Sequence, residues 1–223
     1  MDDLHIYWIS IVVIGDKIAL VGSGGAAKDI LCQIVDAWKA MGQDSKDRII
    51  FVEPDHGFVS RSLLGFPVIS MAMFDPNRFH AILAIGDSQT RAKAIGSMPT
   101  ETKYGTIIHP SCVVSEWIAV GEGSVISAGS ILTCDITLGK HTHINYGSTI
   151  GHDFEGGDFY SAGPGSHVNG NCKAGQRVYL GSNAALKQGV QLADDVYIGM
   201  GSVVLNSISE AGSYAGNPVS KIR

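Results

Sequence analysis

Hydrophobic residues recur at every sixth position through the second half of the chain. From Ile108 to Val204 seventeen consecutive positions keep this register, and only Gly156 among them lacks a hydrophobic side chain. An α-helix repeats every 3.6 residues and cannot keep a period of six over this length. Gly or Asn often lies between these positions, and both residues suit tight turns. The pattern therefore predicts a parallel β-helix over residues 106–223, with three six-residue repeats in each 18-residue coil.

Residues 18–105 follow another pattern, in which apolar runs alternate with helical spacing. The sequence predicts strands at 18–21, 49–52, 67–69 and 81–86, and helices at 26–41 and 89–95. Strand–helix alternation is typical of a small parallel α/β domain, here a Rossmann-like one. The fold class is thus α/β plus β, with the boundary near residue 105.

The first 17 residues form an N-terminal extension with an apolar run at 6–14. This run is too short to span a bilayer, so no membrane span is expected. Asp2 and Asp3 precede it, whereas a signal peptide begins with basic residues. We expect an added edge strand or a contact segment, unless the start codon has been placed too far upstream.

Composition narrows the classes of partner. Hydrophobic residues make up 45% of the chain and charged residues 17%, which predicts a folded core with many turns. The net charge of −5 argues against a nucleic-acid binder, which normally carries a basic patch. The four cysteines lack zinc-ligand spacing and are interpreted as buried apolar residues in a reducing cytoplasm. They are Cys32, Cys112, Cys134 and Cys172.

A glycine-rich turn follows the first predicted strand and opens the first helix. It contains Gly22, Ser23, Gly24 and Gly25. Backbone N–H groups at such a turn can receive phosphate, and an acidic residue after the next strand can bind a ribose hydroxyl. Glu53 and Asp55 occupy that place. The sequence predicts a nucleotide site here, with a close-packed turn that binds nothing as the alternative.

Several stretches resemble one family in order and spacing. They are residues 19–25, 51–55, 84–87 with Arg91, 107–111, 144–145, 150–153, 162–165 and the tail 215–223. The chain is similar to the hexapeptide-repeat acyltransferases, and among them to bacterial nucleotide-sugar acetyltransferases related to sialic acid O-acetyltransferase and UDP-4-amino-sugar N-acetyltransferase. The resemblance implies a left-handed β-helix, a homotrimer with sites between adjacent β-helices, and a cytoplasmic enzyme of polysaccharide biosynthesis.

The resemblance also implies roles for the residues around His152. This histidine would be the general base and Asp153 its orienting partner, while Asn145 would bind substrate. His152 stands two residues after inward-facing Ile150, so it should lie at an accessible corner. An 18-residue coil places Gly170 beneath it, where the backbone N–H could hold an oxyanion. A solvated loop histidine and an ordinary turn glycine are the alternatives.

Three departures from the family pattern affect the expected ligands. Ser161 stands where the family often carries a second histidine in contact with acetyl-CoA, and His143 lies one coil earlier in the same column. His143 is expected either to compensate in part or to be an exposed turn residue. Ala26 replaces a histidine associated with the sugar nucleotide, so the substrate is expected to differ from the commonest one. Lys221, which would contact coenzyme A, arrives one place late in the tail.

These observations predict an acetyl-CoA-dependent N-acetyltransferase that acts on a nucleotide-linked 4-amino sugar by direct transfer and uses no metal. The 18–105 domain would hold the nucleotide sugar and the 106–223 domain would carry out acyl transfer. O-acetylation of a sugar, including sialic acid, remains open because the same base serves both reactions. A non-catalytic nucleotide-sugar-binding protein is the alternative of another class. A zinc enzyme with the same β-helix is disfavoured, because the histidines lack the required spacing.

Overall fold

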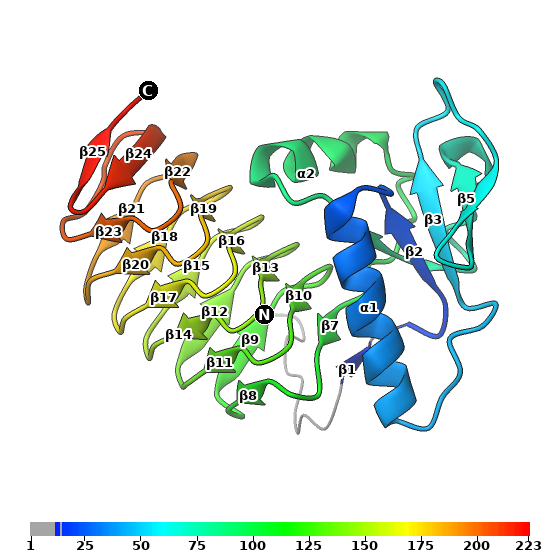
Figure 1. Cartoon of the computed structure of the whole chain (residues 1–223), viewed down its shortest axis with the longest axis horizontal. Coiled ribbons are helices and arrows are strands. Elements are labelled where there is room, and N and C mark those ends of the chain that lie inside the picture. Colours follow the sequence, from blue (N-terminus) through cyan, green and yellow to red (C-terminus); the bar gives the residue numbers. More distant parts are fainter. Residues whose placement is uncertain (1–11, 14) are drawn as a thin grey trace.

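The computed structural model describes residues 12, 13 and 15–223. It places a five-stranded sheet with its helices beside a long β-helix (Figure 1). The expected edge strand is present as β1 (Val12–Val13), which pairs antiparallel with β7 (Ile107–Ile108). The rest of the apolar run at 6–14 lies outside the described residues.

The first sheet follows the order β4-β5-β3-β2-β6 and is parallel except for the β4–β5 pair. Its strands are β2 (Ile18–Val21), β3 (Ile49–Glu53), β4 (Arg61–Leu63), β5 (Phe66–Ser70) and β6 (His80–Leu83). Both faces of β2 are covered: Ile18 and Leu20 join the core under the first helix, while Ala19 and Val21 join a second core on the other face. Burial on two faces explains why this strand is apolar throughout rather than alternating.

Two α-helices accompany this sheet, close to their predicted positions. They are α1 (Gly25–Ala40) and α2 (Ser88–Ala94), with short 3-10 turns at Met71–Met73 and Ile95–Ser97. The buried residues of α1 recur at helical spacing from Ala27 to Trp38. Cys32 lies on the opposite, exposed side of α1, so its predicted burial is wrong, and of the four cysteines only Cys172 is buried. All four thiols are unpaired.

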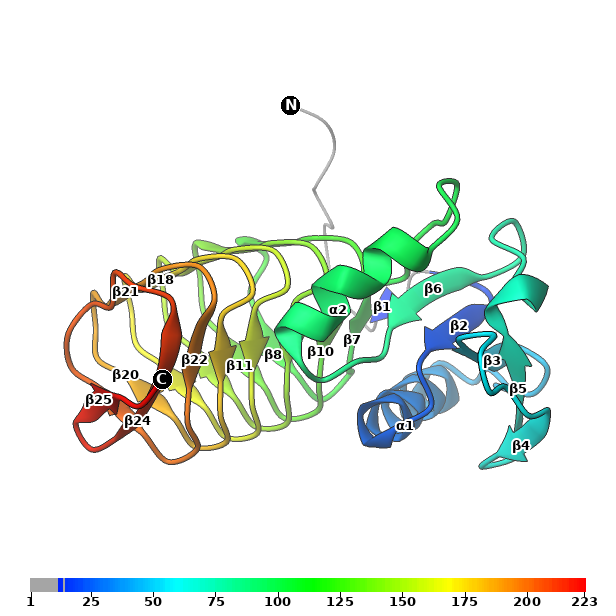
Figure 2. The same cartoon turned by 90° about the horizontal axis from the view of Figure 1, so that it is seen from above.

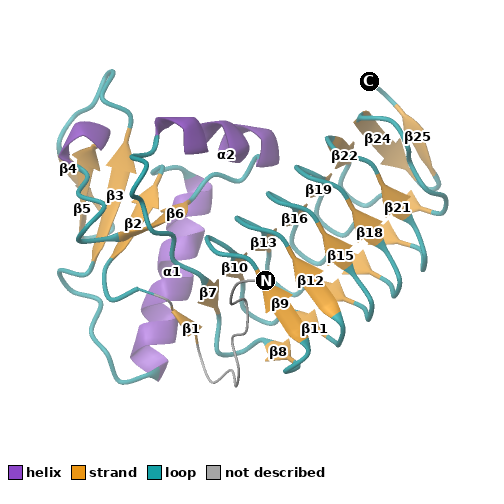
Figure 3. Cartoon of the chain, turned by 180° about the vertical axis from the view of Figure 1, so that it is seen from behind, coloured by secondary structure: helices purple, strands orange, loops and turns teal. Residues whose placement is uncertain are grey.

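The β-helix has three faces, each a ladder of short parallel strands (Figure 3). Face 1 contains β7, β10 (Val125–Ile126), β13 (His143–Ile144), β16 (Ser161–Ala162), β19 (Tyr179–Leu180), β22 (Val196–Ile198), β24 (Gly212–Gly216) and the antiparallel β25 (Val219–Lys221). Face 2 contains β8 (Val113–Val114), β11 (Ile131–Leu132), β14 (Thr149–Ile150), β17 (His167–Val168), β20 (Ala185–Leu186) and β23 (Val203–Val204). Face 3 contains β9 (Ile118–Val120), β12 (Ile136–Leu138), β15 (Glu155–Gly156), β18 (Lys173–Ala174) and β21 (Gln191–Leu192).

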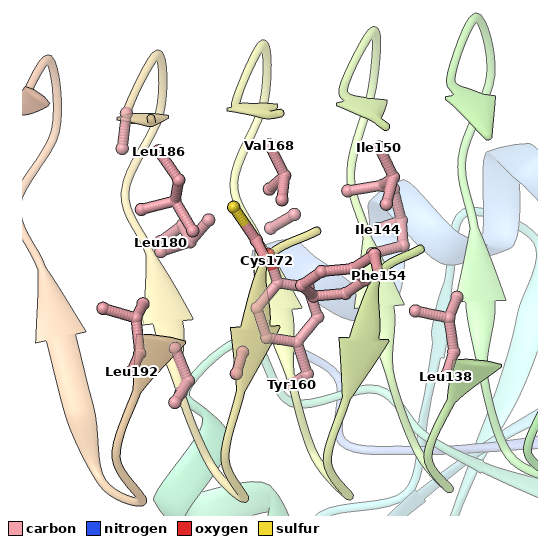
Figure 4. Packing of buried hydrophobic residues seen from close by; sticks show 14 of the residues in the cluster. Leu138, Ile144, Ile150, Phe154, Tyr160, Val168, Cys172, Leu180, Leu186 and Leu192 are labelled. Atoms are coloured by element: carbon pink, nitrogen blue, oxygen red, sulfur yellow. The ribbon is translucent and has the colours of Figure 1, made fainter. Parts of the chain in front are cut away.

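From β7 to β23 the strand partners on each face are 18 residues apart, as with Val125 and Ile107, and only the last parallel pair, β22 with β24, is 16 residues apart. The predicted parallel β-helix and its coil length are therefore confirmed. The hydrophobic positions of the six-residue period point into the lumen, where Ile150, Val168 and Leu186 of successive coils stack along the axis (Figure 4). This continuous core is the main source of stability for the β-helix, because each coil buries its apolar residues against the next.

The one glycine in the hydrophobic register has a packing reason. A Cβ placed on Gly156 would lie 3.0 Å from Cε1 of Phe154, whose ring fills the space that a side chain at 156 would take. The ring of Phe154 also packs on that of Tyr160, with centroids 5.2 Å apart (Figure 4). The missing side chain is thus compensated by two aromatic rings inside the same region of the lumen.

Helices α1 and α2 cover face 1 of the β-helix (Figure 2). Ile107 and Val125 of this face belong to the same apolar core as α1. A second contact between the helices and the β-helix is made by Arg91 of α2, which donates to backbone carbonyl groups of the β-helix. The start of α1, where the glycine turn ends, therefore lies against face 1.

Candidate functional site

His152 and Asp153 form the turn that connects face 2 to face 3. Left-handed backbone at Asp153 (φ 58°) and an N–H bond from Asp153 to the Cys134 carbonyl (3.1 Å) set the turn. Nδ1 of His152 donates to Oδ2 of Asp153 over 2.6 Å, and both side chains are about half exposed (50% and 54%). A carboxylate on Nδ1 leaves the lone pair on Nε2, which can accept a proton. The expected accessible corner is confirmed.

Gly170 lies directly against the ring of His152. A Cβ on Gly170 would overlap Nε2 and Cε1 of that ring, so any larger residue would displace the imidazole. Among the described residues no backbone or side-chain acceptor takes the N–H of Gly170. The predicted adjacency is confirmed, and the arrangement puts a proton acceptor and a free donor side by side.

The glycine turn joins β2 to α1, and its glycines differ in purpose. Gly22 has φ +111°, and a Cβ there would lie 3.2 Å from the Ala84 carbonyl, so the fold itself requires glycine. Gly24 has φ −75°, and a Cβ on Gly24 or Gly25 would meet nothing within 4 Å. No side chain of the described residues caps α1 at Gly24, so the first N–H groups of this helix are open to a ligand.

The acidic residues after β3 already have partners within the chain. Arg61 binds both oxygens of Glu53, at 2.6 and 2.8 Å, and the hydroxyl of Ser23 donates to the same carboxylate. These hydrogen bonds, Arg61 foremost, lower the pKa of Glu53 to about 2. Asp55 accepts the N–H of Ala72 at 2.9 Å. Glu53 therefore holds the glycine turn in place, and substrate binding by either acid stays a prediction.

A cavity of about 240 Å³ lies between the start of α1 and face 1. Gly25 and Ala26 border it on one side and Asn145 on the other, so two predicted substrate residues from distant parts of the chain meet there. His143 also borders it. The expectation that His143 is an exposed turn residue is wrong, because it lies in β13, and its Nε2 is buried and has no partner among the described residues. Sequence periodicity could not show this, since the covering helix comes from elsewhere in the chain.

Ser161 is buried where α2 meets the β-helix. Its hydroxyl accepts from Arg91 at 2.7 Å and from Ser88 at 3.0 Å. It pairs with His143 in the ladder, as expected. Contact with acetyl-CoA stays a prediction for Ser161, whose described partners all lie within the chain.

Arg91 is a key residue whose role sequence reasoning missed. It is completely buried and donates to the carbonyls of His141, Ile85, Gly86, Phe159 and Tyr160. Burial lowers the pKa of the guanidinium to about 9, so it remains charged at neutral pH. Arg91 therefore binds α2 to the β-helix through hydrogen bonds. The sequence signalled Arg91 only as one match in a family pattern.

Lys221 lies at the far end of the β-helix in β25. It forms an ion pair with Glu210 (2.9 Å) and borders a second cavity of about 460 Å³, shared with Arg177 and Arg223. No group of three or more possible metal ligands occurs within the described part of the chain. None of the described helices is long and apolar enough to cross a membrane.

A model of the hexapeptide repeat of succinyl-transferases matches residues 111–134 and 173–206. A point mutant of perosamine N-acetyltransferase from Caulobacter crescentus, in complex with CoA and GDP-perosamine, superposes with a TM-score of 0.81 at 28% identity, covering 96% of this chain and 99% of that one. The acetyltransferase domain of PglB from Neisseria gonorrhoeae, in complex with acetyl coenzyme A, gives 0.81 at 27% identity over 93% and 99%. The chain is thus an acyltransferase, and it is similar to the hexapeptide-repeat sugar acetyltransferases.

WeeI from Acinetobacter baumannii is also similar to this chain, with a TM-score of 0.83 at 26% identity over 92% of this chain and 99% of that one. No curated protein sequence matches this chain significantly. The predicted resemblance to the sugar acetyltransferases is confirmed. Each likeness extends over nearly the whole length of this chain and of the relative. The relatives therefore match both the first sheet and the β-helix.

Proposed function

We propose that this acyltransferase moves an acetyl group from acetyl-CoA to the amino group of a nucleotide-linked 4-amino sugar. The observation that carries the proposal is the His152–Asp153 pair with the free N–H of Gly170 beside it. Solved structures with CoA, acetyl coenzyme A and GDP-perosamine support the same donor and the same class of acceptor.

The proposed step is a direct transfer. The acceptor amine attacks the thioester carbonyl and gives its proton to Nε2 of His152, while the N–H of Gly170 stabilises the oxyanion. The C–N bond forms, the C–S bond breaks, and the thiolate of CoA leaves and takes up the proton. Asp153 holds the imidazole in the tautomer that keeps Nε2 free.

The two ligands are assigned to different parts of the chain. Residues 18–105, as a Rossmann-like domain, would bind the nucleotide sugar, because Gly24 and Gly25 leave helix N–H groups open to phosphate. The β-helix of residues 106–223 would bind acetyl-CoA. Lys221 lies at the edge of a cavity with two arginines, which suits the phosphates of that donor.

The positions of these groups in one chain support a homotrimer. The cavity at Gly25 opens against face 1, whereas His152 lies at the corner between faces 2 and 3, across the lumen. A sugar in that cavity cannot reach His152 of the same chain. A complete site therefore needs the cavity of one protomer and the base of its neighbour, as a closed ring of copies provides.

The test measures acetyl-CoA turnover with a panel of nucleotide-linked amino sugars and their hydroxyl analogues. His152→Ala should lower kcat roughly 10²–10⁴-fold, the range for losing a general base, and leave acetyl-CoA binding nearly intact. Asp153→Asn should lower it less, because the imidazole is only misoriented. Undiminished turnover by His152→Ala would refute the mechanism, and turnover confined to hydroxyl acceptors would refute N-acetylation.

A further inference from the structure

The inference concerns the cavity between α1 and face 1 and rests on the proposed function. Its volume of about 240 Å³ is below the ~300–1,000 Å³ of pockets that enclose drug-sized ligands. It suits one sugar ring rather than a whole nucleotide sugar. Gly25, Ala26 and Gly163 border it with little or no side chain, so the space is left open by the sequence itself.

One polar side chain in this cavity has no partner. Neither ring nitrogen of His143 forms a hydrogen bond within the described part of the chain, and its Nε2 is fully buried. Of the five buried, unpartnered side-chain atoms in the described residues, only this one belongs to a residue that borders the cavity. Leaving such an atom unpaired costs ~1–3 kcal/mol, and unpaired polar groups that persist in folded proteins often serve ligands.

The surroundings of His143 decide what it can bind. Burial and the nearby charges of Arg91 and His141 hold the pKa of His143 well below its usual range. The imidazole is therefore neutral at pH 7 and offers one N–H and one lone pair. A neutral imidazole adds no positive charge that would favour a phosphate, whereas a sugar hydroxyl both donates and accepts, and so matches this ring.

The position of the ring is fixed from two sides. His143 pairs with Ser161 in the ladder, and Ser161 is held by Arg91. Asn145 follows two residues later on the rim of the same cavity, and its side-chain oxygen accepts the N–H of Tyr146 at 3.0 Å. We infer that this cavity holds the sugar ring of the acceptor and that His143 selects the sugar by a hydrogen bond to one ring hydroxyl.

The test compares His143→Phe with the unchanged enzyme, using the best acceptor of the nucleotide-sugar panel. Phe keeps a ring of similar size and removes both nitrogens. The KM for the nucleotide sugar should rise about tenfold or more, as expected for one buried hydrogen bond lost, while the KM for acetyl-CoA changes less than about threefold. His143→Asn, which restores a polar group, should recover part of the loss.

A second readout separates recognition from structural support. The unchanged enzyme should discriminate against the monodeoxy analogue that lacks the recognised hydroxyl, and His143→Phe should lose that discrimination. Tyr160→Phe is the matched control: it removes another buried, unpartnered polar atom, but inside the lumen, and should leave both KM values unchanged. If His143→Phe fails to fold, the Asn variant carries the same comparison.

The outcomes distinguish this inference from the proposed function. An active enzyme in which His143→Phe keeps the KM and the full discrimination among deoxy sugars would overturn the role of His143 alone. An enzyme that acetylates no nucleotide-linked sugar would overturn the proposed function and this inference with it. A rise in the KM for acetyl-CoA instead would place the donor, not the sugar, in this cavity.

Discussion

Replacing Arg91 with methionine removes the main polar contact between α2 and the β-helix. The guanidinium is wholly buried and donates to five backbone carbonyls and to the hydroxyl of Ser161, at 2.7–3.3 Å. Methionine has a similar length but no donor. The carbonyls of His141 and Phe159 accept hydrogen bonds from Arg91 at 3.0 Å. In the variant they would lose these hydrogen bonds and still lie at the contact with α2.

The expected loss is large because the guanidinium forms no ion pair within the described part of the chain and has only the more distant charge of Asp87 near it. Hydrogen bonds to charged groups contribute ~1.5–3 kcal/mol each, and they do not add fully when one group makes several. Removing one partner of a buried charged network generally costs ~3–5 kcal/mol, and we expect Arg91→Met to lower the free energy of unfolding by about this amount. Arg91→Lys should remain destabilised, since an ammonium cannot reproduce the planar fork.

Urea unfolding followed by circular dichroism measures the effect, with the midpoint and slope compared between variants. Lys93→Met is the control: it removes a cation from the exposed side of the same helix and should change the unfolding free energy by less than about 0.5 kcal/mol. A loss below about 1 kcal/mol for Arg91→Met, or full stability of Arg91→Lys, would show that packing alone joins the two parts of the chain.

Four further predictions concern single features of the molecule. Tyr160→Phe should raise the melting temperature, because its buried hydroxyl has no partner in the described part of the chain and desolvating it costs ~1–3 kcal/mol. The folded pKa of Glu53, about 2, lies below its ordinary 4.5, so its ionised form stabilises the protein above pH 4.5 and this contribution fades as the pH falls toward 2. The stability gap between the unchanged protein and Glu53→Gln in urea titrations should therefore narrow at pH 3; a constant gap would contradict this. Gly24→Val should fold normally and raise the KM for the nucleotide sugar but not for acetyl-CoA, since a side chain there meets only open space. Sedimentation should show a trimer, and an active monomer would refute the shared site.

The β-helix could be predicted from the sequence in detail because its period turns spacing along the chain into distance in space. Residues 18 apart stack in register, so the contact between His152 and Gly170 follows from counting. Four of the five strands and both α-helices of residues 18–105 were also predicted to within about three residues, from apolar runs and helical spacing, whereas the short strand β4 was missed. Both predictions rest on local patterns of hydrophobic residues along the chain.

Contacts between the two differently patterned parts were decided only by the tertiary structure. The burial of Ser161 and the anchoring role of Arg91 depend on where α2 lies on face 1. The cavity beside His143 exists because α1 begins there with Gly25 and Ala26. A periodic sequence determines which side of a strand faces outward, but not what covers that side, because the covering helix is packed by shape and by hydrogen bonds that no repeat encodes.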